Sequence, residues 1–423
     1  MAATSWPEAL LGDHVDLLTG HPFKSKQFTD EDSDIRLLRG DNVAQGYLRW
    51  ENAKRWDASE YSSFEKYHLQ KGDVILAMDR PWITAGLKYA WVCDQDLPSL
   101  LVQRVARLRG SNGLLTEYVR CLVGSPAFTD HVLSIITGVN VPHISGRDIK
   151  AFRFLLPPLE TQKKVAEIVT AYDDLIENNT RRIAILEEMA RRLYEEWFVH
   201  FRFPGHEDAT FTETEHGRIP EGWGHCQLDE ISAFISRGVS PKYDEDAECR
   251  VINQKCIRDQ RLNMDHSRRQ SKNVPEAKSV QFGDVLINST GVGTLGRVAQ
   301  VQEQLDKVTV DSHVTIARAN STMDKAFYGQ QLLHLQPHFE DQGVGATGQT
   351  ELSKTRVSET LVLCPSQPIQ SRFGDMVGPV KKQIQVLLSK NANLRAQRDL
   401  LLPKLVSGEI DVGEAEKSLE AAE

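Results

Sequence analysis

Two long stretches of the chain carry apolar residues at alternating steps of three and four positions. One extends from Leu156 to Phe201, and the other from Gln367 to Gly408. This spacing predicts two long helices, because a repeat of 3.5 residues is typical of the seam of a coiled coil. Neither helix can bury a one-sided stripe alone, so we expect them to pair in antiparallel orientation. The predicted seam residues are Val165, Ile168, Tyr172, Leu175, Asn179, Leu186, Leu193, Val380, Ile384, Leu387, Asn391, Leu394 and Leu401.

Polar and aromatic positions add detail to this helix pair. Asn179 and Asn391 each interrupt a seam, where a polar residue costs stability but can fix the register of the pair. Trp197 and Phe198 lie near the end of the first stripe, and we expect them to dock another subunit. The alternative is that each helix packs on its own domain.

The sequence contains an internal duplication. The two helices align without a gap at an offset of 208 residues, so Pro157 falls on Pro365 and Gln162 on Gln370. The globular parts repeat more loosely, as "KGDVILAM" at 71–78 and "FGDVLINS" at 282–289 illustrate. A repeat of this length is too long for a solenoid and indicates a duplicated unit of one globular domain plus one long helix. With the helices antiparallel, the two domains would be related by a pseudo-two-fold axis and held at a fixed separation.

Short β-type runs separated by turn residues dominate each globular half, with short helical runs between them. The predicted fold class is therefore α/β (α+β) with a mixed sheet in each half. The predicted boundaries are a first globular domain over 1–155, a helix over 156–201, a linker over 202–222, a second globular domain over 223–366, a helix over 367–408 and a disordered acidic tail over 409–423.

Charge is distributed unevenly over the 423 residues. The net charge is −9, yet residues 250–300 hold nine Lys and Arg against four Asp and Glu. A local basic face on an acidic protein can bind phosphate, and Arg, Asn and Gln can read base edges. The candidate DNA contacts are Lys24, Lys26, Arg39, Arg49, Arg80, Asn140, His143, Arg147, Lys242, Arg258, Arg268, Arg269, Thr290, Arg297, Gln349 and Lys354.

Motifs for catalysis are missing from the sequence. "GVGTLG" at 291–296 matches the dinucleotide pattern, but the alternating "RVAQVQ" follows it where that pattern needs a helix, so we expect a loop between two strands. We find no ATP-binding loop, nucleophile motif, paired Cys and His residues or metal site, and the acidic pairs along the first helix are expected to form a solvated face. The six scattered cysteines, together with the lack of a signal peptide or membrane span, predict a cytoplasmic protein with reduced thiols.

The quoted helices resemble a known family. "LPPLETQKKVAEIV" with "RRIAILEEMARRLYEEWF", and "IQVLLSKNANLRAQRDLLLPKLVSGEI", are similar to the central and C-terminal regions of type I restriction-modification specificity subunits. The resemblance implies that each globular half is a target recognition domain for one half of a bipartite DNA site. It also implies that the helices set the spacer and dock two modification (methyltransferase) subunits. S-adenosylmethionine would lie on those subunits, and ATP and Mg on restriction subunits that translocate and cleave DNA, while this chain would bind no cofactor and catalyse nothing.

Two other functions remain open from the residues alone. One is a coiled-coil adaptor with two protein-binding heads and no direct DNA readout. The other is an NAD-dependent enzyme that uses "GVGTLG".

Overall fold

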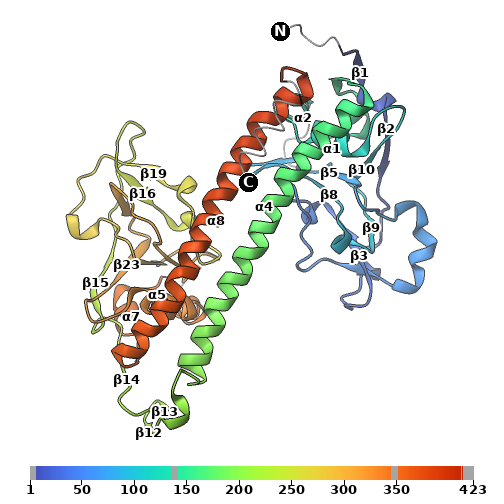
Figure 1. Ribbon diagram of the computed structural model, residues 1–423. Coiled ribbons are helices and arrows are strands. Elements are labelled where there is room, and N and C mark those ends of the chain that lie inside the picture. The colour runs from blue at the N-terminus through green and yellow to red at the C-terminus, as the bar shows by residue number, and fades with distance from the viewer. Residues whose placement is uncertain (1–5, 136–141, 344–350, 411, 413–423) are drawn as a thin grey trace. The chain divides into compact units, whose positions relative to one another are not determined.

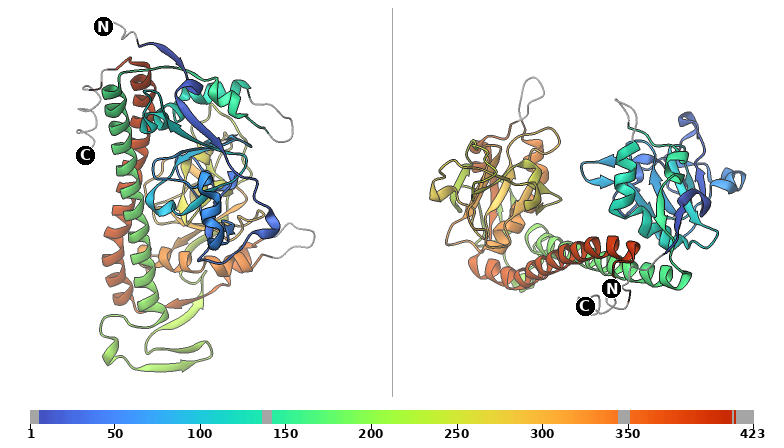
Figure 2. Two further views of the ribbon diagram at one scale, coloured as in Figure 1. Left: turned by 90° about the vertical axis from the view of Figure 1, so that its right-hand side faces the viewer. Right: turned by 90° about the horizontal axis from the view of Figure 1, so that it is seen from above.

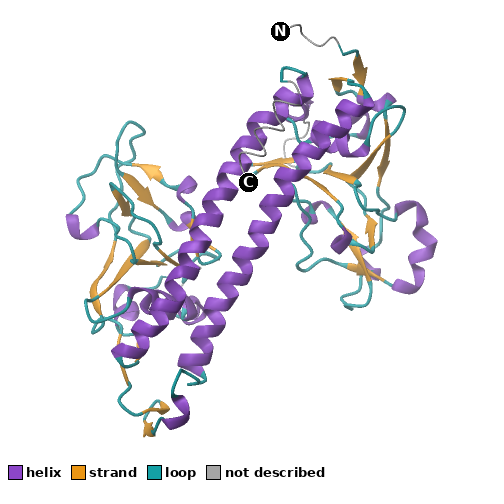
Figure 3. Cartoon of the chain, in the orientation of Figure 1, coloured by secondary structure: helices purple, strands orange, loops and turns teal. Residues whose placement is uncertain are grey.

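The computed structural model describes residues 6–135, 142–343, 351–410 and 412 (Figure 1). The chain forms two compact units. Unit 1 comprises Met1–Asn178 and Asn391–Glu423, and unit 2 comprises Asn179–Lys390. Both units combine helices and strands (Figure 3), so the expected mixed α and β content is confirmed. Two long helices, α4 (Leu159–Tyr194) and α8 (Gln367–Ser407), each contribute one part to either unit.

Unit 1 contains two main sheets. An antiparallel sheet has the strand order β2-β10-β5-β8, and a second sheet has the order β4-β3-β9, in which β3 and β9 are parallel. Strand β1 pairs with β11, which directly precedes α4. The strands are β1 (Glu8–Leu10), β2 (Val15–Thr19), β3 (Ile35–Leu38), β4 (Arg55–Trp56), β5 (Val74–Ala77), β6 (Trp82–Ile83), β7 (Gly86–Leu87), β8 (Tyr89–Trp91), β9 (Ser99–Leu101), β10 (Val105–Gly110) and β11 (Arg153–Leu155). The short helices are α1 (Thr116–Val123), α2 (Pro126–Ile135) and α3 (Gly146–Lys150).

Unit 2 contains sheets of the same kinds. Its antiparallel sheet has the order β15-β23-β20-β21, and its second sheet has the order β19-β16-β22, with β16 and β22 parallel. Strand β14 pairs with β24, which precedes α8. The strands are β12 (Phe211–Thr214), β13 (Gly217–Pro220), β14 (Gly224–Gln227), β15 (Ser232–Arg237), β16 (Arg250–Ile252), β17 (Ile257–Arg258), β18 (Arg261–Leu262), β19 (Arg268–Arg269), β20 (Val285–Asn288), β21 (Val298–Gln300), β22 (Val308–Val310), β23 (Val314–Ala319) and β24 (Leu361–Cys364). The short helices are α5 (Lys325–His334), α6 (Gln336–Asp341) and α7 (Lys354–Ser358).

The repeated "GDV" motif has the same structural role in both units. Gly72 and Gly283 have positive φ angles of 86° and 91°, a conformation that glycine adopts without steric cost. The following aspartate is buried, and one carboxylate oxygen of Asp73 accepts a hydrogen bond from the Gln70 backbone N–H at 2.8 Å. Asp73 also pairs with an arginine on the neighbouring strand β10. Asp284 repeats this arrangement with the Gln281 backbone and an arginine of β23.

A buried glutamine ties the beginning of each long helix to its globular part. Gln162 donates from Nε2 to the carbonyl oxygens of Gly113 and Pro157, both at 2.9 Å, and accepts from the Leu115 backbone N–H. Gln370 donates to the Pro365 carbonyl at 2.8 Å and accepts from the Asp324 backbone N–H. The gapless offset between the helices therefore corresponds to similar contacts at their first turns: in each, the glutamine donates to a proline carbonyl and accepts from a backbone N–H.

Within each unit, one end of α4 lies against one end of α8 (Figure 2). In unit 1, Asn391 Nδ2 donates to the Ile176 carbonyl at 3.3 Å, and the Tyr172 hydroxyl bonds Gln397 Oε1 at 3.4 Å. Residue numbers therefore rise along α8 as they fall along α4. In unit 2, a small core cluster joins Ile183 of α4 to α8.

Every predicted seam residue is buried or half-buried. The stripe of α4 in unit 1 packs at the same time on the globular core, where Val165 and Tyr172 lie in one cluster with Tyr118 and Leu122 of α1. Each helix end thus contacts both its own globular part and the other helix.

Several expectations need correction. Trp197 and Phe198 are each only 4% exposed and pack on Phe373 inside the core of unit 2, so their rings are not available for docking a partner. The Asp173 side chain is 10% exposed between two arginines, so the acidic pairs do not all form a solvated face. The apolar stripe predicted helices but could not tell which polar side chains would find buried partners.

Two further segments differ from their simple interpretation. The polar stretch 202–222 contains the hairpin of β12 and β13. We expected reduced thiols, but Cys226 of β14 and Cys364 of β24 form a disulfide. The pairing of these strands brings the two residues, 138 positions apart in the sequence, to a Cα–Cα distance of 6.6 Å. Within the predicted tail 409–423, residues 411 and 413–423 lie outside the described residues.

Candidate nucleic-acid interface

A cationic cavity of about 450 Å³ lies in unit 1, beside the loop that follows β5. Four of its lining side chains are cationic, and two are carboxylates. The cations are Arg39, Arg80, Lys88 and Arg104, and the carboxylates are Asp41 and Asp79. Arg39 and Arg80 were predicted from the sequence as DNA contacts, and the fold brings them to one wall from separate loops.

Asp79 organises this cavity. Its carboxylate accepts a hydrogen bond from Arg104 at 2.6 Å and lies 2.6 Å from His143 Nδ1, another predicted contact. Burial would raise the pKa of Asp79, but the hydrogen bonds from His143 and Arg104 outweigh it, so the pKa is lowered. The acid thus stays ionised and is neutralised by its neighbours, which leaves the charge of Arg80 available to a ligand, whereas Arg39 lies 3.6 Å from the carboxylate of Asp41.

The backbone presents Arg80 to solvent. Its φ angle of 45° lies in the left-handed region, and its N–H donates to the Pro142 carbonyl at 2.6 Å. A non-glycine residue in this region is uncommon and points to a position that the surrounding structure fixes. The exposed guanidinium forms no ion pair with any described residue, so its five donors remain free to bind an external acceptor.

Lys88 and Arg104 were missed by sequence reasoning. Lys88 directly precedes β8 and is buried, with Nζ donating to the Gly40 carbonyl; burial lowers its pKa. The register of the strands shows which residue of unit 2 corresponds to Lys88. Tyr89, the next residue, pairs with Leu76 of β5, just as Val298 pairs with Ile287 of β20. Lys88 is therefore the equivalent of Arg297, an equivalence that the strand register shows.

The equivalent loop of unit 2 is the "GVGTLG" segment. It connects the antiparallel strands β20 and β21, so the expectation of a loop between two strands is confirmed. Thr290 Oγ1 bonds His313 Nδ1 at 2.7 Å, and Arg297 donates to the Gly293 carbonyl at 2.7 Å. Both predicted residues therefore belong to this loop, but local bonds already engage them. Val292, at its tip, is strongly exposed.

A second basic surface of unit 2 gathers around β19. The backbones of residues 242–244 and 269–271 are hydrogen-bonded in antiparallel register, which places Lys242 opposite Ser271 on the segment that follows Arg268 and Arg269. The Arg268 guanidinium stacks on Tyr243 at 3.6 Å from the ring centroid and lies 3.5 Å from Glu245. An exposed arginine held flat on an aromatic ring keeps most of its donors free for phosphate.

The remaining predicted contacts are dispersed. Lys24, Lys26, Arg49 and Arg147 are exposed in unit 1, and Arg258 and Lys354 are exposed in unit 2, where Arg258 lies beside Asp259. Asn140 and Gln349 lie outside the described residues. Among the residues that the structure describes, no group of His, Cys, Asp and Glu side chains could hold a metal ion. None of the described helices is long and apolar enough to span a membrane.

Comparison with known proteins supports the resemblance seen in the sequence. Residues 11–188 match the family model of the type I restriction modification DNA specificity domain. The specificity subunit of the type I restriction enzyme MjaIX from Methanocaldococcus jannaschii is 25% identical over 341 residues, which cover 78% of each chain. That of EcoAI from Escherichia coli is 35% identical over 175 residues, covering 41% of this chain and 28% of the relative.

A solved structure has the same fold over nearly the whole length. The S subunit of a type I restriction-modification system from M. genitalium has a TM-score of 0.60 at 15% identity, covering 96% of this chain and 97% of that one. The family resemblance is therefore confirmed: residues 11–188 match the type I restriction modification DNA specificity domain, and most of the chain is similar to a type I restriction enzyme specificity subunit.

Proposed function

We propose that the chain reads a bipartite DNA sequence on behalf of a type I restriction-modification complex, with one half-site for each unit. The observation that carries this proposal is the unit 1 cavity, where the exposed Arg80 lies beside a carboxylate that is already neutralised, and Arg39 lines the same cavity. An arginine can donate two hydrogen bonds to O6 and N7 of guanine in the major groove. Exposed lysines around the cavity, such as Lys24 and Lys26, would contact phosphates and supply affinity without sequence preference.

The two long helices would serve the complex in two ways. Paired as an antiparallel coiled coil, they would set the spacer between the half-sites and relate the two units by a pseudo-two-fold axis. They would also dock two modification subunits that bind S-adenosylmethionine and methylate adenine. Restriction subunits with ATP and Mg would join that assembly, and this chain would remain non-catalytic and cytoplasmic. The contacts of α4 with α8 in each unit support the pairing.

Methylome sequencing tests the reading of DNA. The full chain is co-expressed with an adenine methyltransferase subunit of a type I system, and methylated sites are mapped. We expect one bipartite motif. Failure to find any motif with a purified, intact complex would overturn the proposal and leave the adaptor function in its place.

Two variants separate base contacts from phosphate contacts. Arg80→Ala is expected to cost about 1–3 kcal/mol of binding and to relax the sequence preference at one position. Lys24→Ala is the matched control, and it should weaken binding to all sequences alike and reduce the salt slope by about 1. Equal behaviour of the two variants would show that Arg80 does not read a base.

An insertion tests the spacer. Four residues approximate one helical turn, so adding four after Asn179 and four after Asn391 retains both apolar stripes. The half-site sequences should stay the same while the spacer lengthens. An unchanged spacer would contradict the role of the helices in setting the distance.

A further inference from the structure

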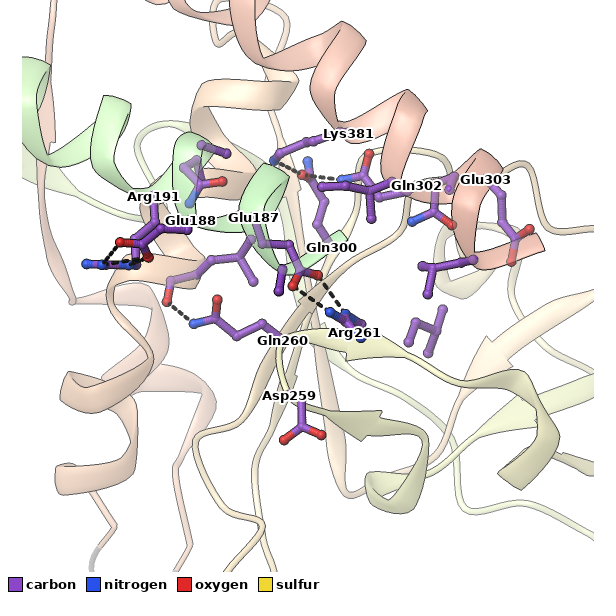
Figure 4. Close-up of a pocket in the computed structure, with 18 residues that line it drawn as sticks. Glu187, Glu188, Arg191, Asp259, Gln260, Arg261, Gln300, Gln302, Glu303 and Lys381 are labelled. Carbon is purple, nitrogen blue, oxygen red and sulfur yellow. Dashed lines mark hydrogen bonds and ion pairs between the residues drawn. The ribbon is translucent and has the colours of Figure 1, made fainter. Parts of the chain in front are cut away.

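Unit 2 contains a second cavity, of about 320 Å³, on the side of the helices (Figure 4). Its walls come from α4, from the hairpin of β17 and β18, from β21, from α5 and from α8. The apolar part of the lining includes Leu262, Leu333, Ile384 and Leu388. The volume is at the lower end of the range for pockets that bind small molecules, and the mixture of apolar wall and few polar groups is typical of them.

Lys381 of α8 supplies a buried cation to this cavity. Its exposed fraction is 8%, and Nζ donates to Gln300 Oε1 at 2.6 Å and to the Ala326 carbonyl at 3.3 Å (Figure 4). Both acceptors are neutral, and no described carboxylate lies within ion-pair distance of Nζ. An ammonium has three donors, and burying it without a counter-ion is costly. Burial lowers the pKa of Lys381 to about 7.

The two glutamates of α4 that line the cavity are already engaged. Glu187 is bound by Arg261 of β18, and Glu188 is bound by Arg191 (Figure 4). The remaining charged lining residues are Asp259 and Glu303, while Asp324, which precedes α5, acts on Lys381 only through space and raises its pKa. The carboxylates of α4 thus do not serve as the counter-ion of Lys381.

Comparison with unit 1 explains why space is left here. Trp91 lies opposite Val74 in the sheet of unit 1, and Gln300 lies opposite Val285 in unit 2, so the two are equivalent. The helix offset of 208 residues makes Asp173 the equivalent of Lys381 and Arg398 the equivalent of Ala190. The cavity therefore lies where unit 1 is filled by larger side chains.

One further equivalence concerns α1 and α5, which begin at corresponding positions after β10 and β23. Arg120 of α1 corresponds to Gly329 of α5. In unit 1, Arg120 stacks 3.3 Å from the Trp91 ring centroid and binds Asp173. A Cβ at Gly329 would lie 2.0 Å from the amide of Gln300, so residue 329 cannot fill the space with a side chain.

We infer that the unit 2 cavity binds a small organic carboxylate, whose anionic group pairs with Lys381 Nζ and whose apolar body lies on Leu333, Ile384 and Leu388. The carboxylate would provide the counter-ion that the fold omits. Because the ligand would touch α4, α8 and the sheet of unit 2, binding would hold these elements together. This site is separate from the residues proposed to read DNA.

Calorimetric titration and thermal unfolding of the full chain test this inference with sodium hexanoate as the probe. Sodium chloride at equal ionic strength and sodium phosphate serve as the comparison arms. We expect hexanoate to bind saturably and to raise Tm, because a ligand that binds only the folded state stabilises it. At pH 8 binding should take up protons, since pairing with a carboxylate restores the charge of Lys381. Absence of saturable hexanoate binding, or equal binding of phosphate, would overturn the inference.

Lys381→Met removes the amine and keeps the length of the side chain, and it should abolish hexanoate binding. Lys382→Met is the matched control. Lys382 is exposed on the same helix, so the Lys382→Met variant should bind hexanoate as the unchanged chain does. Leu388→Trp fills the cavity while leaving Lys381 in place, and it should also block binding. If Lys381→Met or a folded Leu388→Trp variant binds hexanoate normally, the ligand does not occupy this cavity.

Discussion

The same place in the two units is built in two different ways. In unit 1, the carboxylate of Asp173 lies between two guanidinium groups, those of Arg120 and Arg398, and Trp91 covers one of them. In unit 2, Lys381 takes the position of the carboxylate, and the two arginines are replaced by Gly329 and Ala190. The surrounding strands keep their order and their register.

This difference shows which side chains the two units share and which side chains differ between them. The buried "GDV" aspartates and the glutamines at the first helical turn bind corresponding backbone groups in both units, because each satisfies backbone groups that the fold creates. Side chains at the contact of helix and sheet, such as Asp173 with Arg120 and Arg398, bind mainly each other. They can therefore change as a group, from a closed ionic cluster to an open cavity, without altering the backbone.

The largest expected effect comes from breaking the ionic cluster of unit 1. Asp173→Asn leaves Arg120 without its counter-ion and removes the buried one of the two carboxylates that bind Arg398, and we expect the free energy of unfolding to fall by about 3–5 kcal/mol. The Arg398 pKa indicates the strength of the contact: burial would lower it, but Asp173 raises it above its ordinary value. Equilibrium urea denaturation measures the change.

Asp399→Asn is the matched control for this prediction. Asp399 also binds Arg398, at 2.9 Å, but its side chain is 63% exposed. Removing an exposed charge should cost at most about 1 kcal/mol. If the two variants lose the same stability, the cluster is not the feature that holds unit 1 together here.

A smaller effect of opposite sign is expected in unit 2. Lys381→Met removes a buried amine that lacks a counter-ion, and without ligand it should stabilise the chain by about 1–4 kcal/mol at pH 6. The folded pKa of Lys381, about 7, lies below its ordinary value of 10.5, so the unfolded chain binds more protons between these pH values. The stability of the unchanged chain should therefore rise over this range relative to the variant.

Urea denaturation at pH 6 and pH 9 checks this prediction, with Lys382→Met as the control. The advantage of Lys381→Met should shrink from pH 6 to pH 9, while Lys382→Met should show no such trend. A destabilised Lys381→Met variant, or an advantage that is independent of pH, would show that the amine is not a buried charge at pH 6.

The helices and strands of both units were largely predictable from the sequence, and the reasons are specific. Periodic apolar residues determine where helices and strands form, so runs such as 74–77 and 285–288 were readily identified as strands. The gapless offset predicted which residues of α4 and α8 correspond. Periodicity carries no information on which polar side chains meet, and so it gave no sign of the cluster at Asp173 or of the cavity at Lys381.

The candidate DNA contacts were predicted less completely, for a related reason. Arg80 was recognised as a cation in a loop, but its free guanidinium depends on the pairing of Asp79 with Arg104 and His143, which are distant in sequence. Lys88 was overlooked because its correspondence to Arg297 is not visible in the sequence. Lys88 ends the loop before β8 and Arg297 ends the loop before β21, and only the strand register shows that these two positions correspond. Trp197 and Phe198 were assigned to the docking of a partner because they lie near the end of the apolar stripe of the first helix. The sequence did not show that the core of unit 2 covers them.

The smallest effect tests the part of the repeat that the two units share. Gln162→Ala and Gln370→Ala each leave buried backbone groups without partners, and we expect each to lower the free energy of unfolding by about 1–3 kcal/mol. Gln162 makes three hydrogen bonds at 2.9 Å, whereas the Gln370 bond to Asp324 is longer, at 3.3 Å, so the first variant should lose more. Lys163→Ala and Ser371→Ala, the exposed next residues, are the controls. If one glutamine proves dispensable while the other is not, then the first helical turns are not equivalent and the repeat is limited to the backbone.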